Sequence, residues 1–250
     1  MIDIFTIVHD NGMLFLMGQY PNGPLGGVLC TLLISLLAVL LAFPLGVLLG
    51  LARISPFRLL RWPAAGWVYV LRGIPLLMVV FWTYFCVPLL IGHNISGFAT
   101  MLCTLVIYES AYIAEIVRGG IQALPGGQYE ASRALGMSYL KTLRLVVLPQ
   151  ALYNTLPSLV SQLVSIIKDS TLGYVINVPE LTFAANQVNN QLLTKPFQVF
   201  FIVALGYYII CFSLTWLANK LEARIARRRK NTDPQAEQVA KALQLSRAQP

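Results

Sequence analysis

Four charged residues lie inside long apolar stretches of this sequence and away from the ends of those stretches, in a region where ionisable groups are rare. They are Arg72, Glu109, Lys168 and Asp169. A charge at the depth of the hydrocarbon core is costly and marks a functional site by default. A cation binds a carboxylate and an anion binds an ammonium group, so Arg72 or Lys168 together with Glu109 would hold both ends of a zwitterionic amino acid. Ion pairs between helices, which only fix packing, are the alternative.

The spacing of these charges restricts which of them can pair. Lys168 and Asp169 are adjacent, so on a helix they point to different faces, and their partners must come from other helices, water or substrate. Glu115 and Arg118 are three residues apart near the end of an apolar run. We expect these two to form an ion pair on the surface of their own helix.

Other kinds of chemistry have little support. The four cysteines fall in apolar runs without a C-x-x-C pair, which predicts buried, inert thiols. His9 and His93 are isolated and do not make a metal site. No Gly-x-x-x-x-Gly-Lys-Ser/Thr motif occurs, so the chain is not expected to bind ATP. No catalytic residue, metal or cofactor is expected on this chain.

The elements that position the charges are predicted to be membrane-spanning helices. The chain has 250 residues, of which 57% are hydrophobic and 11% charged, whereas a soluble domain carries about 25% charged residues. A helix needs about 20 apolar residues to cross the bilayer. The sequence therefore predicts an all-α integral membrane protein with five transmembrane helices, over residues 26–51, 67–91, 98–117, 151–176 and 199–218.

The basic residues predict the orientation of these helices. The chain has 18 Lys and Arg residues, and nearly all follow the first, third or fifth predicted span, whereas only Lys195 lies in a segment on the opposite side. The side rich in Lys and Arg is the cytoplasmic one. Residues 1–25 are then periplasmic, and they lack the positive region of a signal peptide. Residues 221–250 form a basic cytoplasmic tail, disordered at its end, either simply solvated or bound to lipid headgroups.

The segment 119–148 between the third and fourth spans is long enough to be functional. Pro125, Gly126 and Gly127 interrupt the chain, and a helix is predicted from Gln128 to Leu135. Gly136 follows where a left-handed helix cap is expected, and Ser138 is placed to cap the next helix. A short helix framed by glycines is therefore predicted on the cytoplasmic side.

This segment resembles the EAA loop of the permeases of binding-protein-dependent ABC importers. The resemblance rests on Glu130-Ala131-Ser132, then Gly136, then Leu148-Pro149. In that family the loop forms a coupling helix that docks in a cleft of the cytoplasmic ATPase subunit. The resemblance assigns this role here to Glu130, Ala131, Ser132, Leu135 and Gly136. Small side chains would let the partner approach closely, and Glu130 would lie at the N-terminal end of the helix, where the dipole favours an acid. Ser132 departs from the alanine of the family pattern.

Further blocks are similar to the polar amino acid branch of these permeases, of the glutamate/aspartate or histidine/lysine/arginine/ornithine type. The blocks are Arg72–Leu77, Ala111–Ile121, Leu148–Ala151 and Lys168–Leu172, the last with Ser170 and Thr171 in the reverse of the usual order. The match covers residues 26–220 and implies the type I ABC importer permease fold. It also implies a bacterial inner membrane location and a second permease subunit, identical or paralogous. Two cytoplasmic ATPase subunits that carry ATP and Mg, and a periplasmic amino-acid-binding protein, complete the implied complex.

Two other classes of function remain open at this point. A secondary, ion-coupled amino acid transporter often shows internal repeats, but no repeat is visible in this sequence. A membrane scaffold subunit without a transport path is the other, and the charges inside the spans argue against it. Dependence of transport on ATP and on an ATPase partner would separate both from an ABC permease.

Overall fold

The computed structural model describes the backbone of residues 2–232 and the side chains of residues 4–227. No strand forms within residues 2–232, where backbone pairing between segments is limited to isolated bridges. The elements in chain order are α1 (Ile2–Met17), α2 (Gly27–Ile54), α3 (Arg58–Gly73), α4 (Leu76–Ile91), α5 (Gly97–Gln122), α6 (Gly126–Ala134), α7 (Tyr139–Thr142), the π-helical turn η1 (Leu143–Val147), α8 (Leu148–Asp169), the 3-10 segment η2 (Ser170–Ile176), α9 (Leu181–Leu192) and α10 (Pro196–Thr232).

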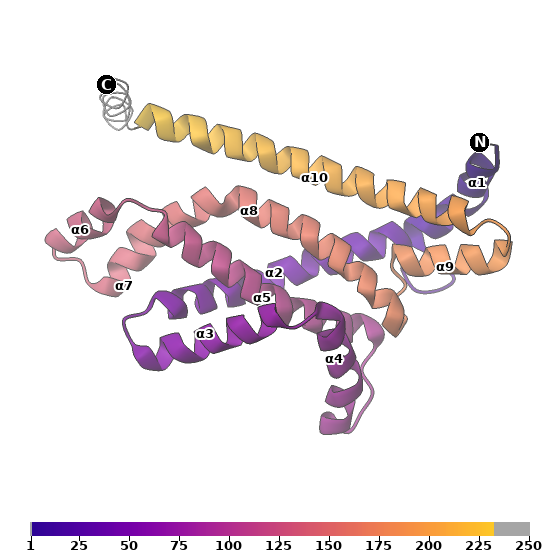
Figure 1. Cartoon of the computed structure of the whole chain (residues 1–250), viewed down its shortest axis with the longest axis horizontal. Coiled ribbons are helices and arrows are strands. Elements are labelled where there is room, and N and C mark those ends of the chain that lie inside the picture. Colours follow the sequence, from indigo (N-terminus) through magenta and orange to yellow (C-terminus); the bar gives the residue numbers. More distant parts are fainter. Residues whose placement is uncertain (1, 233–250) are drawn as a thin grey trace, which may run out of the picture.

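The long helices run along one axis of the molecule (Figure 1). Helix α5 packs against both α2 and α8, and α10 packs along α8. The short helices α6 and α7 lie at the same end as the C-terminal part of α10, whereas α1 and α9 lie at the opposite end. The chain therefore places the predicted coupling segment and the predicted cytoplasmic tail at one end of the bundle.

Four helical segments are long and apolar enough to cross a membrane. They are Gly27–Ile54, Gly97–Gln122, Tyr139–Ile176 and Pro196–Arg227. Helices α3 and α4 pass the same test only together, as a pair bent by 103°, and they supply the fifth span if the pair is counted as one. The all-α membrane architecture is confirmed, and the span count is four or five according to how this pair is counted.

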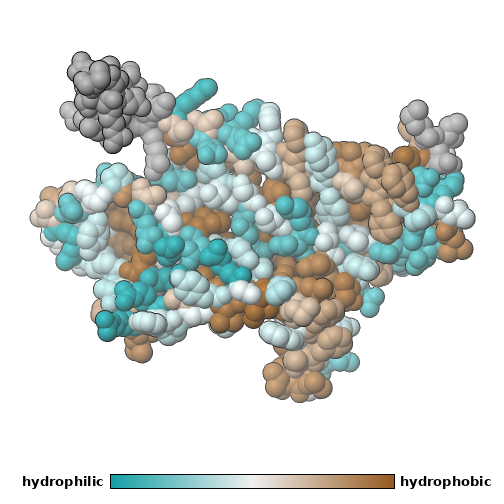
Figure 2. Space-filling model, in the orientation of Figure 1, coloured by the Kyte–Doolittle hydropathy of each residue, from teal (hydrophilic) through white to brown (hydrophobic). Residues whose placement is uncertain are grey.

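The prediction of one continuous helix over residues 67–91 is wrong. The helix stops at Gly73, and Ile74 is extended with φ −108° and ψ 136° before Pro75 begins the next turn. Proline disfavours the α conformation of the residue before it, and it has no N–H to continue the helix. Helix α4 consequently turns away from the bundle (Figure 1), and it is hydrophobic along its length in Figure 2.

Other differences concern segments that carry weak hydropathy signals. The helical region of the fourth span begins at Tyr139, and its π-helical turn η1 ends just before Pro149, which lacks an N–H. Helix α10 extends to Thr232, so the start of the predicted tail is helical, and the predicted disorder at its end lies outside the described residues.

The prediction that the four cysteines are buried is wrong in part. Cys86 and Cys103 are exposed on their helices, and only Cys30 is buried.

The most extensive helix contact in the bundle joins α2 and α5, and small residues bring the two helices close together. A Cβ atom at Gly46 would lie 2.6 Å from the Ile113 side chain, and one at Gly50 would lie 2.9 Å from the carbonyl oxygen of Ala114. Glycines four residues apart let two helix backbones approach closely, which favours association in membranes where van der Waals packing drives it. This contact fixes the position of α5, which carries Glu109 and Glu115.

A buried carboxyl group, absent from the sequence predictions, holds α9 in place. Glu180 is fully buried at the N-cap of α9. Its carboxyl accepts hydrogen bonds from the backbone N–H groups of Thr182 and Phe183 and from the Tyr207 hydroxyl of α10, each at 2.8 Å. The backbone N–H of Leu181 in turn donates to Thr31 Oγ1 of α2 at 3.1 Å. This cluster ties α9 to α2 and α10.

Stability should depend on pH through this carboxyl. Burial raises the pKa of Glu180 from 4.5 to about 7, against the opposing effect of its hydrogen bonds. Because the folded-state pKa lies above the unfolded one, the stabilisation is complete below about pH 4.5 and is lost as the pH rises through about 7. The full loss is on the order of 3 kcal/mol.

The measurement is the apparent melting temperature of the purified complex in detergent between about pH 5 and pH 8. Wild type should lose more stability over this range than Glu180→Gln, whose side chain does not titrate. If the melting temperatures of the two proteins changed equally with pH, ionisation of Glu180 would not destabilise the fold.

Candidate functional site: the coupling helix and a charged cavity in the bundle

The short helix predicted from Gln128 to Leu135 is present as α6 (Gly126–Ala134). It ends in a Schellman motif, in which the Met137 N–H donates to the Ser132 carbonyl at 3.2 Å and the Gly136 N–H donates to the Arg133 carbonyl at 3.0 Å. Gly136 has φ +79°, the left-handed conformation predicted for it. Ser138 occupies the N-cap position of α7, but its side chain makes no capping hydrogen bond.

Four of the five predicted coupling residues are exposed on α6 or directly after it, and Gly136 is one of them. Glu130 and Ala131 are exposed, and Leu135 is 83% exposed. Ser132 is buried instead, and its hydroxyl donates to the Gln128 carbonyl at 2.8 Å. Glu130 is the fifth residue of the helix, and the first turn holds no acid, so the expected dipole effect at the N-terminus does not apply to it. The surface open to a partner is therefore an acid beside small and apolar residues.

Three of the four predicted pathway residues meet in one cavity of about 300 Å³. Helices α4, α5 and α8 each contribute to its wall. The lining residues are Leu76, Tyr108, Glu109, Tyr112, Gln162, Ser165, Lys168 and Asp169. The adjacent residues Lys168 and Asp169 both border this space, although they occupy different faces of α8.

Glu109 is the centre of the charged part of this cavity. Its side chain is fully buried, and Gln162 Nε2 donates to its Oε2 at 2.6 Å. No donor among the described residues reaches its Oε1, and the Asp169 carboxyl interacts with it directly. Ionised carboxylates only accept hydrogen bonds. Two of them in contact therefore require a proton, or a cationic group of a ligand, between them.

Lys168 provides the opposite charge in the same cavity. It is exposed, and its ammonium group makes no ion pair or hydrogen bond within the part of the chain that the structure describes. The cavity thus presents two neighbouring carboxyl groups together with a cation, Lys168, that interacts electrostatically with Asp169. This arrangement suits a ligand that carries both an ammonium and a carboxylate group.

Arg72 lies outside the cavity, in an ion-pair cluster nearer the α6 end. Its guanidinium is 5.3 Å from the centre of the Tyr112 ring and 3.8 Å from the Glu115 carboxylate. Glu115 also contacts Arg53 of α2 and pairs with Arg118 at 2.7 Å. The predicted pair of Glu115 and Arg118 is confirmed. The contacts of Arg72 with Glu115 and Tyr112 are those of an ion pair between helices, and Arg72 is not among the residues that line the cavity.

The break between α3 and α4 forms part of the cavity wall. The Tyr108 hydroxyl donates to the Ile74 carbonyl at 3.3 Å and lies 3.1 Å from the Tyr112 hydroxyl. Carbonyl groups freed by a helix break must find other donors inside a membrane. Tyr108 therefore satisfies a carbonyl group at the break, and both tyrosines border the charged site.

Gln162 and the two tyrosines are site residues that the sequence predictions missed. Gln162 carried a usable signal, because it lies seven residues before Asp169 and hence on the same face of α8. Tyr108 and Tyr112 carried none, since aromatic residues in a membrane helix are common. Their position depends on the break at Pro75.

Comparison with known proteins gives the family. The profile described as "Binding-protein-dependent transport system inner membrane component" matches residues 42–227. The chain belongs to this family. Its members are membrane components of transport systems rather than enzymes, so the multi-pass inner membrane location and the resemblance to ABC importer permeases, including the polar amino acid branch, are confirmed.

Individual relatives support the assignment along most of the chain. The chain is 37% identical over 200 residues to the probable glutamine ABC transporter permease GlnP of Bacillus subtilis (strain 168), covering 79% of this chain and 91% of that protein. It is 40% identical over 214 residues to the glutamate transport system permease GluD of Corynebacterium glutamicum, covering 83% and 77%.

A solved structure supports the fold. The structure described as an amino acid ABC transporter with histidines superimposes with a TM-score of 0.78 at 30% identity, covering 90% of this chain and 99% of that one. The fold is that of type I ABC importer permeases.

Proposed function

We propose that this chain moves polar amino acids across the inner membrane as the permease subunit of an ATP-driven importer, and that the amino acid binds between Glu109, Asp169 and Lys168. The observation that carries the site is the unsatisfied Glu109 Oε1 beside a second carboxyl group in a cavity of about 300 Å³. The relatives named for glutamine and glutamate agree with a polar amino acid.

The two ends of the amino acid have separate places in this cavity. Its ammonium group donates to Glu109 and Asp169, which removes the conflict between two acceptor-only carboxylates. Its carboxylate pairs with the Lys168 ammonium. Gln162 holds the Glu109 carboxyl in place by its 2.6 Å hydrogen bond and acts as a positioning residue. The side chain of the amino acid then points toward Tyr108 and Leu76.

The rest of the proposal concerns the complex around this chain. Residues 26–220 form the transmembrane unit, which pairs with a second permease subunit, identical or paralogous. Segment 119–148 reaches two cytoplasmic ATPase subunits through α6, and ATP and Mg bind to those subunits. A periplasmic binding protein delivers the amino acid at the α9 end. Residues 1–25 lie on that periplasmic side, and the tail that begins at 221 lies on the cytoplasmic side.

Glu109→Gln is expected to lower amino acid uptake strongly. Replacing the charged acceptor by an amide removes an ammonium interaction of about 1.5–3 kcal/mol, which corresponds to roughly a tenfold to hundredfold loss. The measurement is ATP-dependent uptake of radiolabelled L-glutamate, L-glutamine and L-arginine by the assembled complex in proteoliposomes, per mole of complex.

Glu180→Gln is the matched control, because Glu180 is equally buried but lies outside the cavity. It should leave uptake per mole of complex near the wild-type value. Wild-type uptake in Glu109→Gln would show that Glu109 does not bind the amino acid. Uptake that needs an ion gradient instead of ATP would contradict the importer itself.

A further inference from the structure

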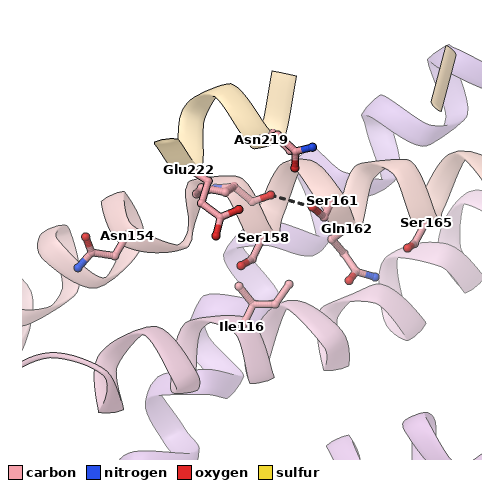
Figure 3. Close-up of a pocket in the computed structure, with 10 residues that line it drawn as sticks. Ile116, Asn154, Ser158, Ser161, Gln162, Ser165, Asn219 and Glu222 are labelled. Carbon is pink, nitrogen blue, oxygen red and sulfur yellow. Dashed lines mark hydrogen bonds between the residues drawn. The ribbon is translucent and has the colours of Figure 1, made fainter. Parts of the chain in front are cut away.

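A second cavity, of about 400 Å³, lies between α8 and α10 on the α6 side of the charged site. Figure 3 shows Ser158 and Ser161 of α8 facing Asn219 and Glu222 of α10, with Ile116 of α5 beneath them. The full lining is Ile116, Asn154, Pro157, Ser158, Ser161, Gln162, Ser165, Ala218, Asn219 and Glu222. Most of these side chains carry a hydroxyl, amide or carboxyl group.

These polar groups are not consumed by contacts within the chain. The Ser161 hydroxyl donates to the Pro157 carbonyl at 3.1 Å, which leaves its oxygen free to accept (Figure 3). The side chains of Ser158, Asn219 and Glu222 make no hydrogen bond or ion pair within the described residues. Unsatisfied polar groups are costly in a membrane-spanning bundle unless they line a water-filled space. Ser158, Ser161, Asn219 and Glu222 are also exposed, so the cavity is open at the surface of the chain and is accessible to water or a polar ligand.

The two cavities form one polar track along α8. Gln162 and Ser165 line both of them. Polar residues recur at three- and four-residue spacing on this face of α8, at positions 154, 158, 161, 165 and 168. From Asp169 to Asn154 the track is about 22 Å long at 1.5 Å per residue, which is most of the thickness of a hydrocarbon core of about 30 Å.

We propose that the cavity between α8 and α10 is a second, weaker amino acid site, where Glu222 receives the ammonium group on the way to the cytoplasm. This proposal rests on the importer function proposed above and assigns the step that follows the Glu109 site. Glu222 is the one ionisable residue among those that line this cavity. The neighbouring cation Lys220 is engaged elsewhere, because its ammonium lies 3.4 Å from the centre of the Trp216 ring.

The difference between the two sites favours forward movement. At the first site the ammonium group meets two carboxyl groups, and Glu109 is fully buried. At the second it meets one carboxyl group, that of the exposed Glu222, among neutral hydroxyls and amides. Charge pairs weaken with exposure to water. The second site therefore binds the amino acid more weakly than the first site does. Weaker binding lets the second site release the amino acid to the cytoplasm.

Thiol labelling of the assembled complex tests the position of this track. In a background where Cys30, Cys86, Cys103 and Cys211 are replaced by alanine, a single cysteine is introduced by Ser158→Cys, Ser161→Cys or Leu156→Cys. Leu156 is the matched control, since it lies on the same stretch of α8, is 39% exposed and does not line the cavity. Inside-out vesicles are treated with a membrane-impermeant maleimide with and without saturating L-glutamate, L-glutamine or L-arginine.

Cysteines at 158 and 161 should react at least about tenfold faster than cysteine at 156, because the thiolate that reacts forms only in contact with water. The amino acid that the complex transports should slow them and leave cysteine 156 unchanged. Equal rates at all three positions, or rates that no amino acid changes, would overturn the proposal. In a complex that takes up amino acids normally, such a result counts against the second site alone.

Transport kinetics give an independent readout of Glu222. We expect Glu222→Gln to lower the maximal uptake rate about threefold or more while the amino acid concentration for half-maximal uptake stays unchanged. Glu222→Asp, which keeps the charge, should restore most of the rate. A Glu222→Gln complex with the wild-type rate would remove Glu222 from the pathway, whereas loss of rate in both variants would indicate a purely structural role.

Discussion

Glu130→Arg should abolish ATP-driven amino acid uptake while leaving the permease folded in the membrane. Glu130 is exposed on α6 and makes no ion pair or hydrogen bond within the described residues, so reversing its charge disturbs no contact inside the chain. If α6 docks on the ATPase as proposed, a reversed charge at that interface costs several kcal/mol, or at least about a hundredfold in affinity. The loss should appear in ATPase co-purification and in uptake together.

The control is a charge reversal elsewhere in the same cytoplasmic segment. Lys141→Glu lies in α7 and is also exposed, and it should keep most of the ATPase binding. Permease abundance in the membrane must be equal in both variants. Normal ATPase binding and uptake in Glu130→Arg would show that this segment docks through other residues, with Ala131, Leu135 and Gly136 the remaining exposed candidates.

The helices with long apolar runs were predictable to within a few residues at most of their ends. Their bounds follow from composition alone, because about 20 apolar residues must be buried in lipid whatever the rest of the chain does. The first span was expected at 26–51 and is found at Gly27–Ile54. The same signal could not reveal α9. The start of this helix is held by Glu180, which accepts from Tyr207 of α10, and by the Leu181 N–H, which donates to Thr31 of α2.

The break at Pro75 shows where hydropathy stops being informative. Proline inside an apolar run is compatible with a continuous span, because neighbouring helices can satisfy the freed carbonyl groups. The run of residues 67–91 gave no reason to choose a 103° bend over a mild kink. The Tyr108 hydroxyl donates to the Ile74 carbonyl at this bend, and a contact between distant parts of the chain is not visible in a hydropathy pattern.

The charges illustrate the same division between local and distant information. The pair of Glu115 and Arg118 was predictable, since residues three apart on a helix are neighbours. That Glu109 and Asp169 meet, while Arg72 does not join them, depends on how α3, α5 and α8 pack. The sequence could therefore nominate the charged residues but could not sort them into a cavity and an ion-pair cluster.

The ion-pair cluster itself leads to the second large prediction. Glu115 is the common partner of Arg53, Arg72 and Arg118, which come from α2, α3 and α5. The side chain of Arg53 is only 8% exposed, and that of Glu115 is 17% exposed. The guanidinium of Arg53 also lies over the Tyr69 ring, 5.2 Å from the ring centre. Removing the single carboxylate would leave three cations close together, one of them buried.

Glu115→Ala should therefore destabilise the permease by about 3–5 kcal/mol, the range for breaking a buried ion pair from one side. The measurement is the apparent melting temperature and the membrane abundance of the complex. The double variant Glu115→Ala with Arg53→Met removes the most buried unpaired charge as well, so it should recover a large part of the loss, as directly coupled residues do in a double-mutant cycle. A Glu115→Ala complex as stable as wild type, or a double variant no better than the single one, would mean that water screens the three arginines and that the cluster does not hold α2, α3 and α5 together.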